Sequence, residues 1–389
     1  MADRRFDIVV FGATGFTGAL TAEYLAGHVP AGARWALAGR SQSKLADVRG
    51  RLGSDFADLP LLPADVSDPG SLREVAEASR VVITTVGPYI RYGEPVVAAC
   101  ADAGTDYVDL TGEPEFVDQM WLSYHARAVE TGARLVHSCG FDSIPYDLGA
   151  QFTVEQLPEG VPIAMEGFVR VGGTFSGGTY QSTIEILSRL RQGAAIARDR
   201  RAREPRPSDR RAKGVAGMPH HDDFAGGWVV PFPTIDPQTV LRSARALERY
   251  GPDFTYSHYL AVKRLPVLAG LVGGAAGVAA LAQIPPTRKM LLTLKSSGEG
   301  PSSEQREKSW FRVRFAARAG GREVRTEVSG GDPGYSETSK MLAESALCLA
   351  FDDLTQRSGQ LTPAVAMGDA LRRRLVAAGI KFEVLDGGP

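Results

Sequence analysis

Cysteine is scarce in this sequence: three residues, Cys100, Cys139 and Cys348, are spread over 389 positions and form no Cys-x-x-Cys pair. This spacing excludes a disulfide framework and cysteine-based zinc sites, and it is typical of a protein in a reducing compartment. The sequence also lacks His-Glu-x-x-His and Gly-x-Ser-x-Gly segments. Their absence argues against the metalloprotease and serine hydrolase classes.

Residues of metal-ligating type occur together at His220, His221, Asp222 and Asp223. Adjacent side chains rarely point at one ion, and no second cluster with ligand spacing accompanies this run. We therefore expect a solvated loop here and predict no metal site.

Neither sign of charge dominates, because the formal net charge is -1 with 23% charged and 43% hydrophobic residues. This balance is ordinary for a globular protein and predicts no general attraction to nucleic acid. The charged segment 1–7 runs directly into a predicted strand and leaves no room for a cleavable signal peptide. We therefore expect a cytoplasmic protein, with peripheral contact at the inner face of the plasma membrane as an open alternative.

Long hydrophobic runs are limited to residues 265–286, which carry no charge and are flanked by basic residues on both sides. The run has the length of a bilayer span. Glycine, alanine and proline leave it only eight large aliphatic residues, so insertion would be marginal. Three interpretations stay open: a buried helical hairpin or lid, an interfacial membrane contact or lipid-channel lining, and a transmembrane helix.

A basic run covers residues 198–213, with eight basic side chains, three acidic ones and two prolines. Such a run is typical of a mobile, solvated loop. It also has the charge to hold an acidic carrier protein or an anionic lipid.

Short apolar runs alternate with longer amphipathic runs from residue 6 to about residue 148. This pattern predicts strand–helix units on a parallel sheet, the α/β doubly wound fold of a Rossmann domain at 1–150. The predicted strands cover 7–11, 34–38, 60–63, 81–85, 107–109 and 134–137. The predicted helices cover 18–25, 44–52, 71–77, 93–103 and 115–130.

A second domain is expected because a chain of this length exceeds one hydrophobic core. In segment 311–315 apolar residues alternate with arginine, as in an antiparallel strand with one wet face, and segment 322–328 is its predicted hairpin partner. We therefore predict an α+β substrate domain with an antiparallel sheet at 151–335. The C-terminal part, 336–389, is predicted to be helical and to pack back on the Rossmann domain.

Three glycines, Gly12, Gly15 and Gly18, follow the first predicted strand and open the first predicted helix. In a dinucleotide-binding turn they provide a tight turn, close approach of the backbone to pyrophosphate, and close packing of helix on strand. Free N–H groups at the helix start favour phosphate. The predicted cofactor contacts are Gly12, Ala13, Thr14, Gly15, Phe16, Thr17 and Gly18; a purely structural turn is the alternative.

The end of the second predicted strand decides between the two nicotinamide coenzymes. NAD-specific sites place an acidic residue there, whereas this chain has Gly39-Arg40-Ser41. The Arg40 guanidinium suits a forked contact with a 2'-phosphate, and Ser41 and Lys44 would add donors. The sequence therefore predicts NADPH, with a plain exposed arginine as the alternative.

Two more strand ends are predicted to contact the cofactor. The residues are Asp65 and Val66 after the third strand, and Val86, Gly87, Pro88 and Tyr89 after the fourth. An aspartate in the first position would accept from the adenine amino group, or cap a helix instead. A Gly-Pro turn in the second lets the backbone approach the ribose and nicotinamide.

Several motifs occur in a fixed order along the whole chain. They are Gly12-Ala13-Thr14-Gly15-Phe16-Thr17-Gly18, Ala38-Gly39-Arg40, Thr84-Thr85-Val86-Gly87-Pro88-Tyr89, Tyr107-Val108-Asp109-Leu110-Thr111-Gly112-Glu113 and Cys139-Gly140-Phe141-Asp142-Ser143-Ile144-Pro145. Together they resemble the saccharopine dehydrogenase-like superfamily, and within it the trans-acting enoyl reductases of actinobacterial lipid biosynthesis. The resemblance implies NADPH-dependent reduction of the α,β-double bond of an acyl chain, often a polyketide synthase product, and a link to glycolipid synthesis at the membrane.

Enoyl reduction requires a hydride at the β-carbon, stabilisation of charge on the thioester oxygen, and a proton at the α-carbon. Donors are therefore sought after the fourth and sixth predicted strands, whose loops border the same crevice. The catalytic candidates are Tyr89, Asp142, Ser143 and Tyr146, and Cys139 is grouped with the cofactor-binding residues. Tyr146 departs from the family pattern, which implies a serine there. The alternatives are a packing role for Tyr89 and a helix cap at Ser143.

Three functions stay open. The first is a trans-acting enoyl reductase for a long-chain lipid or polyketide acyl substrate, free or bound to a carrier protein, with an oligomeric assembly also open. The second is an imine reductase like the true saccharopine reductases, whose substrate carboxylates would require several arginines in the pocket. The third is a non-catalytic, NADPH-binding interaction protein associated with membranes.

Overall fold

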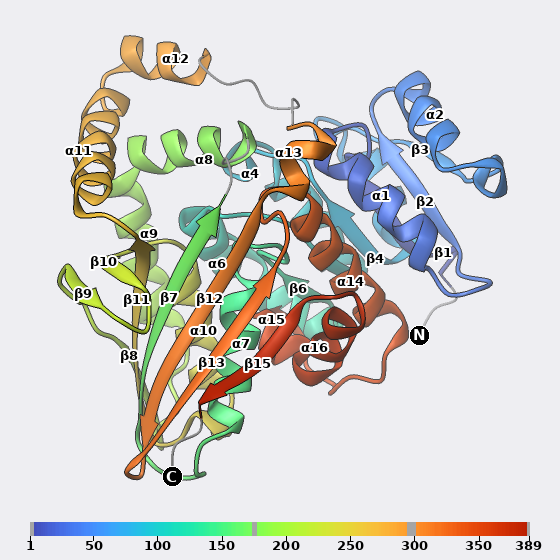
Figure 1. The fold of residues 1–389 in the computed structure, drawn as a ribbon. Helices are drawn as coiled ribbons and strands as arrows, with labels where there is room; N and C mark the ends of the chain where they lie inside the picture. Colours follow the sequence, from blue (N-terminus) through green and yellow to red (C-terminus); the bar gives the residue numbers. More distant parts are fainter. Residues whose placement is uncertain (1–3, 173–176, 294–300, 387–389) are drawn as a thin grey trace.

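The computed structural model describes residues 4–172, 177–293 and 301–386. Figure 1 shows two β-sheets side by side, one near the N-terminus and the other reaching down to the C-terminus. We call them sheet A and sheet B. The α/β fold predicted from the sequence is confirmed: a Rossmann domain adjoins a second domain with a mixed, largely antiparallel sheet.

Sheet A has seven parallel strands in the order β14-β6-β5-β4-β1-β2-β3. Their bounds are β1 Phe6–Phe11, β2 Trp35–Gly39, β3 Leu61–Pro63, β4 Ser79–Thr84, β5 Asp106–Val108, β6 Arg134–Val136 and β14 Gly359–Leu361. The first six agree with the predicted strands to within about two residues, the usual uncertainty of element ends. The seventh comes from the C-terminal part, which was predicted as helical, and pairs with β6.

Helices cover both faces of sheet A. Their bounds are α1 Phe16–His28, α2 Gln42–Arg51, α3 Pro69–Ala78, α4 Tyr89–Tyr92, α5 Glu94–Ala103, α6 Pro114–Thr131 and α14 Ser336–Phe351, with a 3-10 turn η1 at Ser54–Phe56. Ile8 and Val10 pack in the core with α1, α2 and α14, whereas Val9 and Phe11 pack with α3, α5 and α6. A strand buried on both faces is apolar throughout, which explains the sequence of β1.

Sheet B has the order β15-β13-β12-β7-β11-β10-β9, and β8 also pairs with β11. The bounds are β7 Ile163–Gly172, β8 Arg211–Gly214, β9 His220–Asp222, β10 Gly227–Pro231, β11 Asp253–Val262, β12 Trp310–Ala319, β13 Arg322–Gly330 and β15 Lys381–Asp386. The predicted hairpin is present as β12 and β13. Phe311, Val313 and Phe315 are buried, while Arg314 lies on the other face and pairs with Glu327.

Helix α7, Ile144–Glu155, joins the two domains. It begins after the loop that follows β6 and packs on β12 and β13. Helices α10 Asp236–Ala246, α15 Pro363–Ala366 and α16 Gly368–Ala377 pack around it, and a 3-10 turn η2 spans Glu248–Tyr250. The apolar core therefore continues from sheet A through α7 to sheet B.

The basic run is ordered rather than a mobile loop over its first part. Residues 198–203 end helix α9, Leu190–Arg203. Arg200 is buried and forms ion pairs with Asp118 of α6 at 2.6 Å and with Glu204. The prediction is wrong here because Asp118, a buried acid on a distant element, pairs with Arg200 and holds this part of the run in place. Counting charges along the chain does not reveal such a partner.

The apolar run folds as a helical hairpin of α11, Leu265–Ala282, and α12, Pro285–Thr293. Figure 1 shows both beside α8, Gly177–Ser188, at the end of the molecule where β7 finishes. A small apolar core of Ile184, Ala282 and Leu291 joins the three helices. Over 4–172, 177–293 and 301–386, no helix combines the length and hydropathy that a membrane crossing requires.

Candidate functional site

The glycine loop leaves no room for side chains at two of its positions. Gly12 has a φ of +86°, and a Cβ there would lie 2.7 Å from Cγ2 of Val86. A Cβ on Gly18 would lie 2.3 Å from the carbonyl oxygen of Gly12. Gly15 precedes α1 and provides no side-chain cap, so the first N–H groups of the helix remain available to an anion. This geometry fits the pyrophosphate of a dinucleotide.

Residues from the C-terminal third of the chain border this loop. The Tyr335 ring lies edge-to-face on Phe16 with ring centroids 4.8 Å apart. The guanidinium carbon of Arg306, on the short helix α13 Ser303–Glu307, lies 5.6 Å from the centroid of the same Phe16 ring. The cofactor loop is therefore partly covered, and the cover brings one positive charge close to the start of α1.

Arg40 lies beyond the end of β2 with 78% of its side chain exposed, and its Nε is 3.8 Å from Oδ2 of Asp65. Oδ1 of Asp65 accepts from the Ser67 N–H at 2.8 Å and the Ser67 hydroxyl at 2.7 Å. These hydrogen bonds, more than the Arg40 charge, lower the pKa of Asp65. Ser41 caps α2 by accepting from the Lys44 N–H at 3.4 Å. One long ion pair leaves the guanidinium open to a phosphate.

A surface hollow of about 710 Å³ lies next to this region. Its lining residues are Thr14, Lys44, Ala46, Asp47, Val48, Gly50 and Arg51. The hollow therefore extends from the glycine loop along α2, and Lys44, one of the predicted cofactor contacts, lies on its wall.

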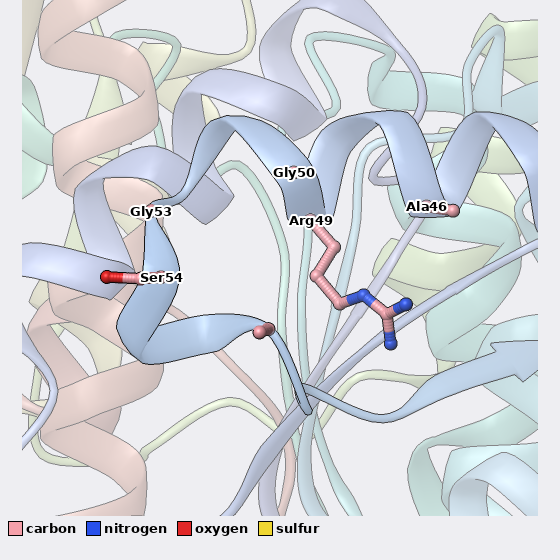
Figure 2. A pocket seen from close by; sticks show the side chains of 6 residues that line it. Ala46, Arg49, Gly50, Gly53 and Ser54 are labelled. Carbon is pink, nitrogen blue, oxygen red and sulfur yellow. The ribbon is translucent and has the colours of Figure 1, made fainter.

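Figure 2 shows a different hollow, of about 360 Å³, between α2 and η1. Its lining residues are Ala46, Arg49, Gly50, Gly53, Ser54 and Ala57. The guanidinium of Arg49 donates to the Leu59 carbonyl oxygen at 3.2 Å, so it serves the local fold. The lining includes neither a carboxyl nor an imidazole, and we assign no chemistry to this hollow.

The buried Asp109 fixes the loops that follow β5 and β6. Its Oδ1 accepts from the N–H groups of Thr111 at 3.0 Å and Ser138 at 2.8 Å. Its Oδ2 accepts from the Tyr107 hydroxyl at 2.8 Å and from Nδ1 of His137 at 2.6 Å. Four donors satisfy this carboxylate, so it holds loop geometry rather than reacting.

Tyr89 is buried at the turn after β4, and its polar atoms are all engaged. Its N–H donates to Glu113 at 3.0 Å. Its hydroxyl donates to the Thr84 carbonyl oxygen at 3.1 Å and accepts from the Leu110 N–H at 3.2 Å. Burial, aided by the Asp109 charge, raises the pKa of Tyr89 well above its ordinary value. This hydroxyl therefore joins the end of β4 to the loop that follows β5.

Ser143 and Cys139 are also buried in the fold. The Ser143 hydroxyl lies 3.1 Å from the Thr239 hydroxyl, which joins the start of α7 to α10. The Cys139 thiol donates to the Val136 carbonyl oxygen at 3.4 Å, and burial raises the pKa of this thiol well above its ordinary value. The Ser143 hydroxyl therefore ties two helices together, while the Cys139 thiol bonds back to the end of β6.

Asp142 and Tyr146, the other two catalytic candidates, are differently placed. Within the described ranges, neither the Asp142 carboxyl nor the Tyr146 hydroxyl makes a hydrogen bond to another residue. Burial, with the charges of Asp109 and Glu113 adding to it, raises the pKa of Asp142 to about 7. Burial, followed by the charges of Asp236 and Asp142, raises the pKa of Tyr146. Of the four candidates, these two keep free proton donors.

Two residues that the sequence did not single out complete this cluster. Asp236 at the start of α10 and His258 in β11 are buried, and Nε2 of His258 lies 3.7 Å from Oδ2 of Asp236. The Tyr146 ring meets the His258 ring edge-to-face at 5.3 Å. In sequence, Asp236 resembles a helix-start residue before Pro237, and a lone histidine in an apolar strand resembles a core residue, so neither gave a functional signal.

Known proteins match this chain both in its first domain and over its whole length. Residues 8–136 match the family described as the saccharopine dehydrogenase NADP binding domain. A provisionally named trans-acting enoyl reductase of Mycobacterium tuberculosis is 41% identical over 98% of this chain and 97% of its own length. Trans-acting enoyl reductases of Mycobacterium bovis and Mycobacterium ulcerans are each 38% identical, with 97% of both chains covered.

Among solved structures, the apo saccharopine dehydrogenase (L-Glu forming) of Saccharomyces cerevisiae superposes with a TM-score of 0.56. The match covers 97% of this chain and 99% of the yeast chain at 12% identity. The two proteins therefore share the fold.

Proposed function

We propose, because this chain belongs to the trans-acting enoyl reductase family, that it uses NADPH to reduce the carbon–carbon double bond of an α,β-unsaturated acyl thioester. The observation that carries the proposal is the position of two free proton donors, Asp142 and Tyr146, beyond β6 at the carboxyl edge of sheet A. In doubly wound folds this edge receives both the dinucleotide and the reacting group.

The Rossmann domain has the residues that NADPH requires. The N–H groups at the start of α1 face the pyrophosphate, and the exposed Arg40 binds the 2'-phosphate. When bound, NADPH supplies the hydride that reaches the β-carbon. The tight backbone at Gly12 and Gly18 keeps side chains out of the phosphate-binding turn. Proton donation and stabilisation of the thioester oxygen are left to side chains of the protein.

Asp142 delivers the proton to the α-carbon in this proposal. Its raised pKa of about 7 keeps a large fraction of the carboxyl protonated at neutral pH, and an acid whose pKa lies near the working pH transfers protons best. Tyr146 donates a hydrogen bond to the thioester oxygen, where negative charge develops. Tyr89 and Ser143, whose hydroxyls are engaged, hold the surrounding loops in place.

The same cluster argues against an imine substrate with several carboxylates. A nearby arginine would lower the pKa values of these acids. Among the described residues, no arginine is named among the groups that shift the pKa values of Asp142, Tyr146 and Asp236. A substrate with several carboxylates would need arginines to balance its charge once it is buried here, whereas an uncharged acyl thioester needs none. The presence of free proton donors likewise favours an enzyme over a binding protein without catalysis.

The test is NADPH oxidation by the purified chain with 2-enoyl thioesters of increasing length. We expect NADPH consumption together with mass-spectrometric appearance of the saturated thioester, and weaker activity with NADH. Turnover of an α-imino acid alone would overturn the proposed substrate class. NADPH binding without turnover of any enoyl thioester would instead support the non-catalytic alternative.

We propose further that the α11–α12 hairpin lies against a membrane surface, as expected for a protein of glycolipid synthesis. Leu281, Ile284 and Met290 are 40%, 51% and 54% exposed, and Lys289 beside them is exposed too. Apolar side chains next to basic ones suit an anionic bilayer surface. Co-sedimentation with anionic vesicles should fall in an Ile284→Ser/Met290→Ser variant, and equal binding by the unaltered chain to neutral vesicles would contradict the electrostatic part.

The acyl chain is proposed to arrive on a carrier protein, because the relatives are named trans-acting. Arg201 and Arg203 are exposed on α9 and offer positive charge to an acidic carrier. A carrier-bound enoyl thioester should give a lower KM than the same acyl group on a short thiol. The Arg201→Glu variant should show no such difference in KM. Equal KM values for the carrier-bound and the short thioester would contradict the carrier hypothesis.

A further inference from the structure

Arg306 reaches the phosphate-binding turn from the second half of the chain. It lies on α13, which is followed after two residues by β12, a strand of sheet B. A capping box fixes the start of this short helix. The Ser302 N–H donates to Oε1 of Gln305 at 3.1 Å, and the Gln305 N–H donates to the Ser302 hydroxyl at 3.3 Å. The second domain therefore holds Arg306 on a well-defined turn.

The aromatic ring of Phe16 is the surface on which Arg306 packs. Phe16 is the first residue of α1 and directly follows Gly15. The guanidinium carbon of Arg306 lies over this ring, 5.6 Å from its centroid, and the Tyr335 ring meets it edge-to-face at 4.8 Å. Oδ2 of Asp332 accepts from the Tyr335 N–H at 3.1 Å, which fixes the second contact. The Phe16 ring thus holds the guanidinium beside the first turn of α1.

The charge of Arg306 is not neutralised by an acid in the part of the chain that the structure describes. There its Nη2 donates to the Ser303 hydroxyl at 3.3 Å, and the residue forms no ion pair. Lys308, two positions further on, differs because its Nζ lies 2.6 Å from Oε1 of Glu304. A half-buried cation without an acidic partner is stabilised when an anion lies beside it. Arg306 therefore has N–H donors and a charge available for an anion at the start of α1.

We propose that Arg306 binds the pyrophosphate of NADPH, so that the second domain adds a contact to a cofactor site built mainly by the Rossmann domain. This inference rests on the use of NADPH in the proposed function and is independent of the acyl substrate. The N–H groups in the first turn of α1 have no partner inside the helix and receive the phosphates. Phe16 belongs to this turn. A guanidinium over its ring approaches the same phosphates from the other side and binds them through charge-assisted hydrogen bonds.

The affinities of the two nicotinamide coenzymes separate this role from that of Arg40. NADPH and NADH both carry the pyrophosphate, so Arg306→Met should raise both Kd values by the same factor, about 10-fold. The ratio of the two Kd values should stay the same, whereas a residue that binds the 2'-phosphate changes this ratio. Methionine keeps an apolar contact with Phe16 and removes only the charge. Calorimetry on the full-length chain measures both constants.

Two further variants control for charge and packing. Lys308→Met removes a positive charge close to the same helix but away from Phe16, and both Kd values should be unchanged. Arg306→Lys restores the charge without the planar group and should recover part of the affinity. Added salt should shrink the difference between Arg306→Met and the unaltered chain, because ions screen the contact between the guanidinium and the pyrophosphate.

Hydrogen exchange supplies a readout that needs no turnover. NADPH should slow amide exchange over residues 303–307 in the unaltered chain and have no such effect in Arg306→Met. Unchanged Kd values in Arg306→Met would overturn the proposal and leave Arg306 as a packing contact of Phe16. A rise in the Kd for NADPH alone would also overturn it, by assigning Arg306 to the 2'-phosphate.

Failure of this inference can be distinguished from failure of the proposed function. If the unaltered chain binds neither coenzyme, both are refuted. If both coenzymes bind, Arg306→Met weakens them equally and no enoyl thioester is reduced, the Arg306 contact is supported and the proposed reaction is refuted.

Discussion

The two sides of the candidate site, here called its walls, are made from different kinds of sequence. On the Rossmann wall, contiguous segments at strand ends supply backbone N–H groups, tight glycines and one exposed arginine. On the wall formed by α10 and sheet B, single residues from separate elements, Asp236 and His258, lie beside each other. Recognition of the cofactor by the Rossmann wall is therefore local in the chain, whereas the cluster of titratable side chains is assembled from distant positions.

The walls also differ in how they are fastened. Helices α8 and α9 are tied to the Rossmann domain by ion pairs that join Arg91 to Glu185, and Arg200 to Asp118. Glu115 accepts from both Nη2 and Nε of Arg189, at 2.6 and 3.0 Å. The second sheet is joined through the apolar face of α7 instead. Charge positions the helical layer, and packing positions the sheet that completes the site.

The Asp142→Asn variant should show the clearest functional difference between the two walls. Loss of the proton donor is expected to lower kcat by about 10²–10⁴-fold. The Kd for NADPH should stay the same because the carboxyl does not belong to the phosphate-binding turn. Stopped-flow kinetics and calorimetry measure the two quantities. Asp102→Asn, at an exposed carboxyl paired with Arg127, is the control. A fall in kcat together with a rise in the Kd for NADPH would show that the walls are not functionally distinct.

Arg200→Ala should break the fastening of the helical layer. Removing the arginine takes the 2.6 Å ion pair from the buried Asp118 and leaves it the hydrogen bond from Gln238. This loss is expected to lower the free energy of unfolding by about 3–5 kcal/mol. Arg203→Ala, three residues on, removes an exposed pair with Asp199 and should cost about 0–1 kcal/mol. Urea unfolding of both variants gives the comparison. Equal, small effects would mean that the Arg200 pair does not support α9.

Arg40→Ala tests the Rossmann wall alone. The lost charge-assisted contacts are worth about 1.5–3 kcal/mol, so the Kd for NADPH should rise about 10- to 100-fold. NADH has no 2'-phosphate, and its Kd should not change. Arg49→Ala, whose guanidinium donates to a backbone carbonyl next to α2, is expected to preserve the ratio of the two Kd values. A variant that keeps its NADPH preference would remove Arg40 from the site.

Ser143→Ala should have the smallest effect and would sharpen the distinction between scaffold and chemistry. Its hydroxyl is bonded to Thr239, so we expect a loss of about 1 kcal/mol in stability with kcat nearly unchanged. Thr239→Val should reproduce that loss, and the double variant should lose no more than either single one. A large drop in kcat for Ser143→Ala alone would return this serine to the list of proton donors.

Much of the Rossmann wall could be predicted because its determinants are consecutive. The apolar run of β1 followed by Gly12, Gly15 and Gly18 specifies strand, turn and helix within about a dozen residues. The six predicted strands appear in sheet A for the same reason. By contrast, β14 was missed, since three residues paired beside β6 leave too short a pattern to detect.

The four catalytic candidates also show what the sequence could not decide. Tyr89, Ser143, Asp142 and Tyr146 looked equivalent in sequence because all four follow strand ends. Their hydrogen bonds separate them: two hydroxyls are engaged, and two donors are free. Likewise, the arginines of residues 198–213 looked alike until the buried Asp118 distinguished Arg200 from the rest.

The chain by itself determined the dinucleotide fold, the shape of the phosphate-binding turn and the choice of an arginine at the end of β2, because each depends on neighbours along the backbone. Tertiary structure alone decided which side chains keep a proton to give, since burial and the meeting of α7, α10 and β11 set the pKa values of Asp142 and Asp236. Solvent exclusion and charge proximity arise in three dimensions, and no spacing of residues along the chain encodes them.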